Sequence, residues 1–400
     1  MAYRKPSLFH YRMAQGVCNV VATCLFRRRI LRNEIRDAQG PYVVIANHQA
    51  ALDFVNLIGA TRRPMSFVIS KSFFSTLPIR GWMEKMGVLP KQQFQTTVSD
   101  MKRMRSVIEA GQPLVIYPAG LMCEDGLSTP IPAATYRFLQ WLGADVYVAR
   151  TTGSYFVMPK WKGGIHPGRT DMDIYRLFTK EQLADLTEDE IKETVEQHLL
   201  FDAYREQEET RVKYRGTRHI EGLENVLYLC PHCGQEFVTQ VSGDTIRCTA
   251  CGYEQVGDEY GFLHNRKGLG EEIRYVSDWS RLIYQRLRER VVSGHEQGMS
   301  APVTIKMIDP VKNAFVPVGE GVLDLNADRF SIVGTVNGES VDVSVSTTNI
   351  PTLPFSPGKH LEVQDGATIY RCAPHNGRLV MKFINLVKIF YELKNAPATV

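Results

Sequence analysis

The sequence predicts an α/β fold for the first part of the chain, followed by a small cysteine-rich domain and a β-rich C-terminal domain. Short apolar runs alternate with amphipathic stretches from Pro41 to about Trp161, four cysteines gather between residues 230 and 251, and short β-prone runs follow Ala301. The chain has 400 residues, of which 44% are hydrophobic and 22% charged, a composition typical of two or three folded domains.

Residues 1–37 are predicted to form a basic N-terminal helix. They include eight Lys or Arg residues against two acidic residues, Glu34 and Asp37. The apolar run from Val17 to Phe26 is shorter than the roughly 20 residues that a membrane-spanning helix needs, and it leads directly into three arginines. A short apolar face beside basic residues is typical of a helix that lies in an anionic lipid interface. A first helix that only packs on the domain is the alternative.

Residues 38–180 are predicted to form the α/β domain. Apolar strands are expected at Tyr42–Ala46, Leu114–Tyr117 and Asp145–Ala149, with amphipathic helices between them. Strands that alternate with helices in this way indicate a largely parallel sheet that helices cover.

Helical segments flank the cysteine-rich region. Residues 181–212 are expected to hold an acidic, solvated helix through Glu209, because Thr187 and Glu190 have the spacing of a capping box. Residues 266–298 are expected to hold a second helix and then a linker that is rich in turn-forming residues.

The cysteine-rich region, residues 213–265, contains two Cys-x2-Cys motifs. The predicted metal ligands are Cys230, Cys233, Cys248 and Cys251, with 14 residues between the two motifs. Four thiolates at this spacing are typical of a tetrahedral zinc site, and a site with every position filled is structural. The region resembles a zinc ribbon, which implies Zn²⁺ as a structural cofactor and leaves a protein partner of the ribbon open.

Residues 301–396 are predicted to form a small antiparallel β barrel closed by a helix, with a β sandwich as the alternative. Turn residues separate β-prone runs such as Gly321–Val333 and Val341–Val345, and apolar residues recur at helical spacing from Val380 to Tyr391. This order of elements resembles the pleckstrin-homology fold or a related lipid-surface fold. The resemblance implies a domain that holds the chain against a membrane or a partner. A barrel that only packs on the rest of the chain is the alternative.

Charge and cysteine usage limit the partners and the compartment. The formal net charge of +4 is small for this length and argues against a dedicated nucleic-acid binder. The cysteines outside the two motifs are scattered, which is typical of a reducing compartment. We therefore expect a cytoplasmic protein.

His48 and Asp53 follow the predicted strand Tyr42–Ala46. Residues five apart on an ideal helix lie roughly 140° apart, so these side chains meet only if His48 lies at the strand exit and Asp53 in the first turn of the next helix. An imidazole that a carboxylate orients is suited to remove the proton of an alcohol during acyl transfer. A histidine in the core with an unrelated aspartate is the alternative for an isolated His-x4-Asp spacing.

The surrounding sequence, roughly residues 12–161, resembles the lysophosphatidic acid acyltransferase family of glycerolipid acyltransferases. Four blocks carry the resemblance in the family's order: Ala46–Phe54; Lys71–Phe74 with Gly87–Lys91; Tyr117–Gly120 with Glu124–Gly126; and Val146–Ala149. The resemblance implies that His48 is the general base and that Asp53 orients it. It also implies substrate contacts from Asn47, Lys71, Lys91, Tyr117, Pro118, Gly120 and Glu124.

The same resemblance implies the substrates and the location. The donor would be an acyl thioester, either acyl-CoA or acyl carrier protein, and the acceptor a lysophosphatidic acid-like phosphorylated glycerol lipid. A lipid acceptor and a basic N-terminal helix together imply a peripheral protein on the cytoplasmic face of a membrane.

Three positions depart from the family's pattern. Ala119 stands where glutamate is usual, and Glu124 is the candidate replacement; Lys91 stands where arginine is usual, and it lacks the fork that holds phosphate in two places. Tyr147 stands where the fourth block usually has proline. These departures leave the exact acceptor open. They also keep a second hypothesis: a catalytically inactive acyltransferase-like protein that binds lipids or partners.

Overall fold

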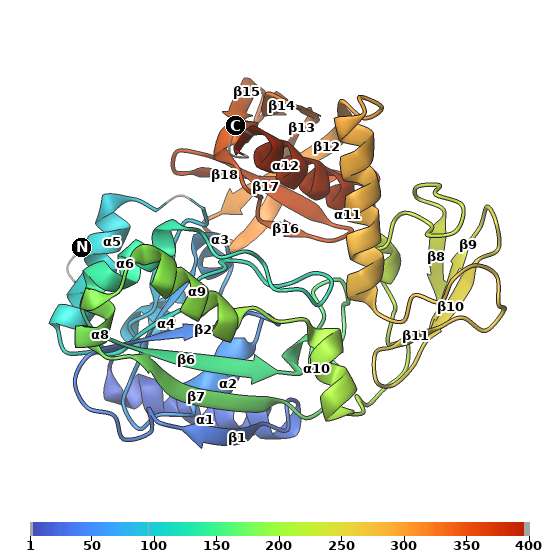
Figure 1. Cartoon of the computed structure of the whole chain (residues 1–400). Coiled ribbons are helices and arrows are strands. Elements are labelled where there is room, and N and C mark those ends of the chain that lie inside the picture. The colour runs from blue at the N-terminus through green and yellow to red at the C-terminus, as the bar shows by residue number, and fades with distance from the viewer. Residues whose placement is uncertain (1–2, 95, 396–400) are drawn as a thin grey trace. The chain divides into compact units, whose positions relative to one another are not determined.

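The computed structural model describes residues 3–94 and 96–395, and the chain divides into two compact units (Figure 1). The first unit comprises Met1–Lys160 and Gly164–Gly216, and the second comprises Trp161–Gly163 and Thr217–Val400. Of the predicted N-terminal helix (1–37), residues 1–2 lie outside the described residues. Of the predicted C-terminal domain (301–396), residue 396 does.

The first unit is built on a seven-stranded sheet of order β1-β7-β6-β2-β5-β3-β4. Its strands are β1 (Arg29–Asn33), β2 (Tyr42–Ala46), β3 (Ser66–Ser70), β4 (Leu89–Lys91), β5 (Leu114–Ile116), β6 (Asp145–Thr152) and β7 (Asp171–Phe178). Neighbouring strands run parallel, except that β6 and β7 are antiparallel. The prediction of a largely parallel sheet is confirmed, and its expected strands correspond to β2, β5 and β6.

Helices cover both faces of this sheet (Figure 1). The helices of this unit are α1 (Leu8–Cys24), α2 (Asp53–Ile58), α3 (Lys71–Ser75), α4 (Arg80–Lys85), α5 (Val98–Glu109), α6 (Ala134–Leu142), α7 (Ser154–Val157), α8 (Lys180–Asp185), α9 (Glu188–Leu199) and α10 (Ala203–Thr210). Successive side chains of a strand point to opposite faces. Val44 accordingly joins the apolar cluster that includes residues of α1 and α2, whereas Val43 joins the cluster that includes residues of α5, α6 and α9.

Strand β2 is central because its sequence, Tyr-Val-Val-Ile-Ala, suits a strand buried on both sides, and all five residues are buried. The parallel strands β6, β2, β5, β3 and β4 end at one edge of the sheet. His48 follows β2, Tyr117 follows β5, Lys71 follows β3, and Lys91 ends β4. The sheet therefore gathers side chains from distant parts of the sequence along that edge.

The acidic segment after Leu186 forms two helices, where the sequence predicted one. Thr187 and Glu190 make the predicted capping box at the start of α9. The chain then leaves helical geometry after Leu199, and Asp202 caps α10 by accepting the backbone N–H of Tyr204 at 3.0 Å. The break brings Leu200 and Phe201 to the candidate site, as described below.

The second unit contains two antiparallel sheets. The smaller one has the order β11-β10-β9-β8 and consists of β8 (Thr239–Ser242), β9 (Thr245–Cys248), β10 (Glu254–Gly257) and β11 (Leu263–His264). A short 3-10 helix, η1 (Leu223–Asn225), precedes it, and α11 (Val276–Val292) follows it.

The C-terminal sheet has seven strands in the order β15-β14-β13-β12-β18-β17-β16. They are β12 (Gly298–Asp309), β13 (Ala314–Asn326), β14 (Arg329–Val336), β15 (Glu339–Ser346), β16 (Phe355–Ser356), β17 (His360–Asp365) and β18 (Thr368–Pro374), with the 3-10 helix η2 (Thr347–Asn349) after β15. Helix α12 (Leu379–Asn395) contacts β12 and β16 and has α11 beside it (Figure 1).

The antiparallel strands and the helix that packs on them are confirmed, but the sheet is not a closed barrel. Within residues 3–94 and 96–395, the edge strands β15 and β16 do not pair with each other. Strand β16 has only two residues, and both pair with β17. In the same described part of the chain, no helix is both long and apolar enough to span a bilayer.

Candidate active site and metal site

His48 and Asp53 lie across the turn between β2 and α2, where the sequence predicted them. Nδ1 of His48 is 3.0 Å from Oδ2 of Asp53. The same oxygen accepts the backbone N–H groups of Gln49 at 2.7 Å and Ala50 at 2.9 Å. The side chain of Asp53 is 2% exposed and that of His48 is 21% exposed. One buried carboxylate oxygen therefore holds both the ring and the loop, and the Asp53 contact uses Nδ1 rather than Nε2 of the ring.

Asn47 fixes the same loop to β6. Its Nδ2 donates to the carbonyl of Thr151 at 2.7 Å, and its Oδ1 accepts the N–H of Thr151 at 2.8 Å. Gln49 adds a further connection, because its Oε1 accepts the N–H of Tyr155 at 3.3 Å. Both polar atoms of Asn47 thus support the loop, and the substrate contact expected for Asn47 stays a prediction.

Tyr117 lies against the imidazole. The ring centroids of Tyr117 and His48 are 4.6 Å apart, with a 36° angle between the ring planes. Burial raises the pKa of Tyr117, and the nearby Asp53 charge raises it further, so the phenol stays neutral. Gly120 closes the turn after β5 with a φ of +70°, a conformation that favours glycine, and its N–H donates to the carbonyl of Tyr117 at 3.0 Å.

A small pocket opens beside His48. Its lining is mostly apolar and comprises Ala46, Asn47, His48, Pro118, Ala119, Ser128, Thr129, Ile131, Leu199, Leu200 and Phe201. Ala119, the position of the expected glutamate, therefore lines this pocket without a carboxylate. The proposed replacement, Glu124, is buried but does not line the pocket. Nothing in the sequence predicted that Leu199–Phe201 line the pocket: Leu199 ends α9, and Leu200 and Phe201 lie in the break before α10.

The two predicted lysines lie at the ends of paired strands. Strands β3 and β4 pair with Ser70 opposite Lys91, which places Lys71 one residue beyond that pair. Gln93 accepts the hydroxyl of Ser70 at 3.2 Å and donates through Nε2 to the carbonyl of Gly120 at 2.6 Å. Burial lowers the pKa of Lys91, and the Asp100 charge partly offsets this effect. The sequence did not predict that Gln93 would connect Ser70 to Gly120.

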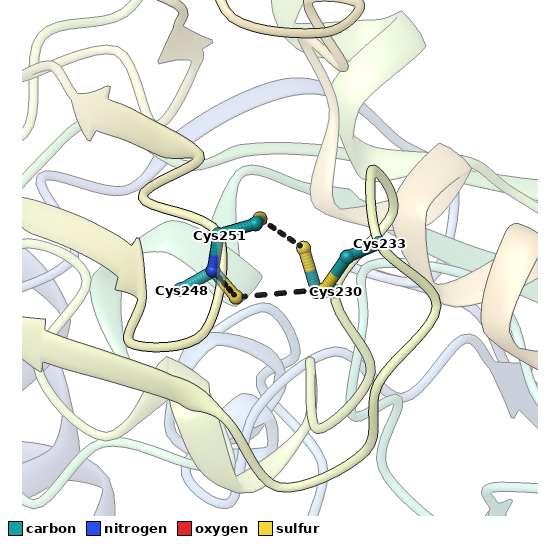
Figure 2. Close-up of side chains that lie close together, drawn as sticks. All are labelled: Cys230, Cys233, Cys248 and Cys251. Atoms are coloured by element: carbon teal, nitrogen blue, oxygen red, sulfur yellow. Dashed lines mark hydrogen bonds between the residues drawn. The ribbon is translucent and has the colours of Figure 1, made fainter.

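The four predicted cysteine ligands meet in the second unit (Figure 2). All four Sγ atoms lie within 4.8 Å of one another. The Sγ atoms of Cys230 and Cys251 are 3.7 Å apart, as are those of Cys233 and Cys248. A tetrahedral zinc with Zn–S bonds of about 2.3 Å would hold sulfurs about 3.8 Å apart. The donor set therefore fits such an ion.

Two family models match parts of the chain. Residues 27–166 match the model described as Acyltransferase, and residues 223–254 match a zinc-ribbon model described as DNA directed RNA polymerase, 7 kDa subunit. A comparison with curated proteins found no match. Among solved structures, the chain is similar to the 1-acyl-sn-glycerophosphate (LPA) acyltransferase PlsC from Thermotoga maritima, with 15% sequence identity, 47% of this chain and 76% of that chain covered, and a TM-score of 0.41. The first family match spans β1 through β6 and includes His48 and Asp53, so residues 27–166 form a domain of the acyltransferase family.

Proposed function

We propose that the protein transfers a fatty acyl group from an acyl thioester to the hydroxyl of a lysophosphatidic acid-like glycerol lipid. The observation that carries the proposal is the 3.0 Å contact between Nδ1 of His48 and Oδ2 of Asp53, inside a domain of the acyltransferase family. This contact fixes the ring while its other nitrogen stays available, which is the arrangement that a general base needs.

In the proposed reaction, Nε2 of His48 takes the proton of the acceptor hydroxyl as its oxygen attacks the thioester carbonyl carbon. The Asp53 carboxylate stabilises the imidazolium that forms. The carbon–sulfur bond then breaks, the imidazolium returns the proton to the departing thiolate, and the ester and a free thiol are released. Donors include acyl-CoA and acyl carrier protein.

Lys71 and Lys91 are proposed to bind the acceptor phosphate. Lys71 directly follows β3 and Lys91 is the last residue of β4, both on the side of β5 away from β6. Gln93 connects Ser70, the residue before Lys71, to Gly120. A protonated lysine attracts phosphate as a point charge. Tyr117, Pro118, Gly120 and Glu124 remain the proposed further substrate contacts, whereas we assign Asn47 the positioning of the His48 loop.

Helix α1 supports a membrane-bound location. Leu8, Phe9, Met13, Val17 and Val20 are each more than half exposed. Arg4, Lys5 and Arg12 are exposed beside them, and the first acidic residue of the chain is Glu34. An exposed apolar stripe with basic neighbours fits the surface of an anionic bilayer. We propose that α1 lies on the cytoplasmic face of a membrane, from which the enzyme takes its acceptor.

The metal at the four cysteines is proposed to be Zn²⁺ in a structural role. The donor set is all sulfur, the two measured Sγ separations match a tetrahedral zinc, and four protein ligands leave no position for substrate. Elemental analysis of the purified chain should find close to one zinc per chain.

One assay tests the proposed activity. The purified chain is incubated with an acyl-CoA or acyl carrier protein donor and with lysophosphatidic acid or glycerol 3-phosphate, and thiol release is followed. Loss of a general base lowers the rate by about 10²- to 10⁴-fold, so we expect that decrease for His48→Ala.

The alternative is an inactive lipid- or partner-binding protein, which the lack of a carboxylate at Ala119 in the pocket lining favours. It would be accepted if the wild type released no more thiol than His48→Ala with every donor and acceptor pair.

A further inference from the structure

Helix α11 holds the loop that carries the first two cysteines. We call residues 228–239, which include Cys230 and Cys233, the knuckle segment. The indole Nε1 of Trp279 donates to the carbonyl of Leu229 at 2.9 Å. Arg286 donates to the carbonyl of Pro231 at 2.9 Å and to that of Cys230 at 3.5 Å. A guanidinium thus contacts the backbone of a ligand residue and of its neighbour.

Helix α12 reaches the same segment through a buried lysine. Nζ of Lys382 is 2.9 Å from Oε2 of Glu236 and 2.8 Å from Oε2 of Glu296, and its side chain is only 9% exposed. Arg290 of α11 contacts the same two carboxylates at 3.1 and 2.9 Å. Glu236 lies three residues after Cys233. Two cations and two anions therefore join the knuckle segment to both helices.

Further contacts from α12 and the residue before it reach the ends of the knuckle segment. Arg378 donates to the carbonyl of Phe237 at 2.7 Å and to the hydroxyl of Thr239 at 2.9 Å. At the other end, Nδ2 of Asn385 donates to the phenol oxygen of Tyr228 at 3.4 Å. Helix α12 also packs on the C-terminal sheet, where it contacts β12 and β16 and the rings of Phe383 and Phe330 lie 6.2 Å apart. The same helix therefore belongs to the core of the β domain and to the support of the metal site.

These contacts make the metal and α12 depend on each other. A metal-binding loop is seldom preformed without its ion. If the knuckle segment loosens, Lys382 loses one of its two carboxylates while it stays largely buried, which is unfavourable for a buried charge. By thermodynamic reciprocity, whatever the metal contributes to α12 docking, docked α12 contributes to metal binding.

We propose that metal binding by the four cysteines and the docking of α12 on the knuckle segment are one cooperative equilibrium. Metal occupancy then controls the order of a helix that begins 128 residues after the last ligand, Cys251 (379 minus 251). The inference rests on the proposed metal site and is independent of acyl transfer.

Metal affinity tests the coupling from one side. The full chain and its variants are titrated with Zn²⁺ against a chromophoric chelator at fixed pH. Loss of an outer-shell contact typically weakens metal binding by about 10- to 100-fold, and we expect this for Arg286→Ala and Lys382→Met. Arg288→Ala is the matched control, because Arg288 is exposed on the same helix and takes part in none of the contacts described above. Wild-type affinity in both Arg286→Ala and Lys382→Met would overturn the proposal.

Hydrogen exchange of the wild-type full chain tests the effect of the metal on α12 and needs no variant. The metal is withdrawn with a chelator under reducing conditions, and amide exchange is compared with and without Zn²⁺. We expect faster exchange in the knuckle segment and in α12, and unchanged exchange in α9 of the first unit. Unchanged protection of α12 in a chain that does bind Zn²⁺ would overturn this inference alone. A chain that binds no Zn²⁺ would overturn the metal proposal as well.

Discussion

The two sites of this protein share a local sequence origin but differ in how they are completed. The four cysteines come from two short motifs, and every position of the resulting tetrahedron is a protein sulfur. His48 and Asp53 also come from one short motif, but the imidazole reaches the surface and keeps one nitrogen unused by Asp53. A site whose donors are all satisfied within the chain stabilises the fold, whereas a site with an unused group is available for chemistry.

The largest effect is expected from removing one of the cysteine ligands, and it should fall on the metal site alone. A structural zinc contributes about 10–16 kcal/mol of apparent binding free energy that is coupled to folding. Cys248→Ser should therefore abolish stoichiometric zinc and remove the thermal transition of the second unit, while the first unit keeps acyl transfer. Differential scanning calorimetry and the thiol-release assay measure the two outcomes. Loss of both the thermal transition and the thiol release in Cys248→Ser would show that the His48 site depends on the metal site.

Two substitutions of Asp53 separate its proposed role in orienting His48 from its role in holding the loop. Asp53→Asn can still offer an oxygen to the N–H groups of Gln49 and Ala50 but loses the charge, so kcat should fall by about 10²- to 10⁴-fold with little change in stability. Asp53→Ala should lose the same activity and also about 1–3 kcal/mol for each buried donor left without a partner. Equal free energies of unfolding for the two variants would contradict the role of Asp53 in holding the loop.

The exposed face of α1 allows a matched pair of substitutions. Val17 on α1 is 65% exposed and Val98 on α5 is 66% exposed. Full burial of a valine contributes about 1.5–3 kcal/mol, so Val17→Ser should lower partitioning onto anionic vesicles by about tenfold. Val98→Ser should leave it unchanged. Flotation of the two variants with vesicles decides the point, and equal losses would remove α1 as the bilayer contact.

The smallest expected effect concerns pH and Lys91. A lysine binds phosphate electrostatically only while protonated, and burial lowers the pKa of Lys91. The KM for the acceptor should therefore rise by a few-fold with increasing pH, beginning at a lower pH than for an ordinary lysine. Lys91→Arg keeps its charge throughout, because arginine stays protonated. Parallel KM profiles for wild type and Lys91→Arg would exclude Lys91 from phosphate binding.

The features that the sequence predicted are those set by neighbours along the chain. Strand β2 has the predicted bounds because its five residues suit a buried strand, and the capping box of Thr187 and Glu190 needs only a three-residue spacing. The four cysteine sulfurs also meet as their spacing indicated. Acyltransferase family membership of residues 27–166 agrees with the resemblance drawn from the motifs.

The features that the sequence did not predict depend on contacts between distant residues. Asn47 finds its partner, Thr151, 104 positions along the chain. Gln93 bridges Ser70 and Gly120, and nothing in its immediate neighbours indicates this. The prediction of a barrel was wrong because turn residues and β-prone runs indicate where strands lie but not whether the two edge strands pair.

The parallel pairing of β1 with β7 has a mechanical consequence for the N-terminal helix. Only Leu25–Arg28 separate α1 from β1, and Arg29 binds both carboxylate oxygens of Asp171, at 2.9 and 3.0 Å. The helix is thus attached to the sheet by a short connection, and the Arg29–Asp171 ion pair at its end limits the rotation of the helix. If α1 rests on a bilayer as proposed, this short connection determines the tilt of the whole sheet, its height above the bilayer and the depth at which the His48 imidazole is held.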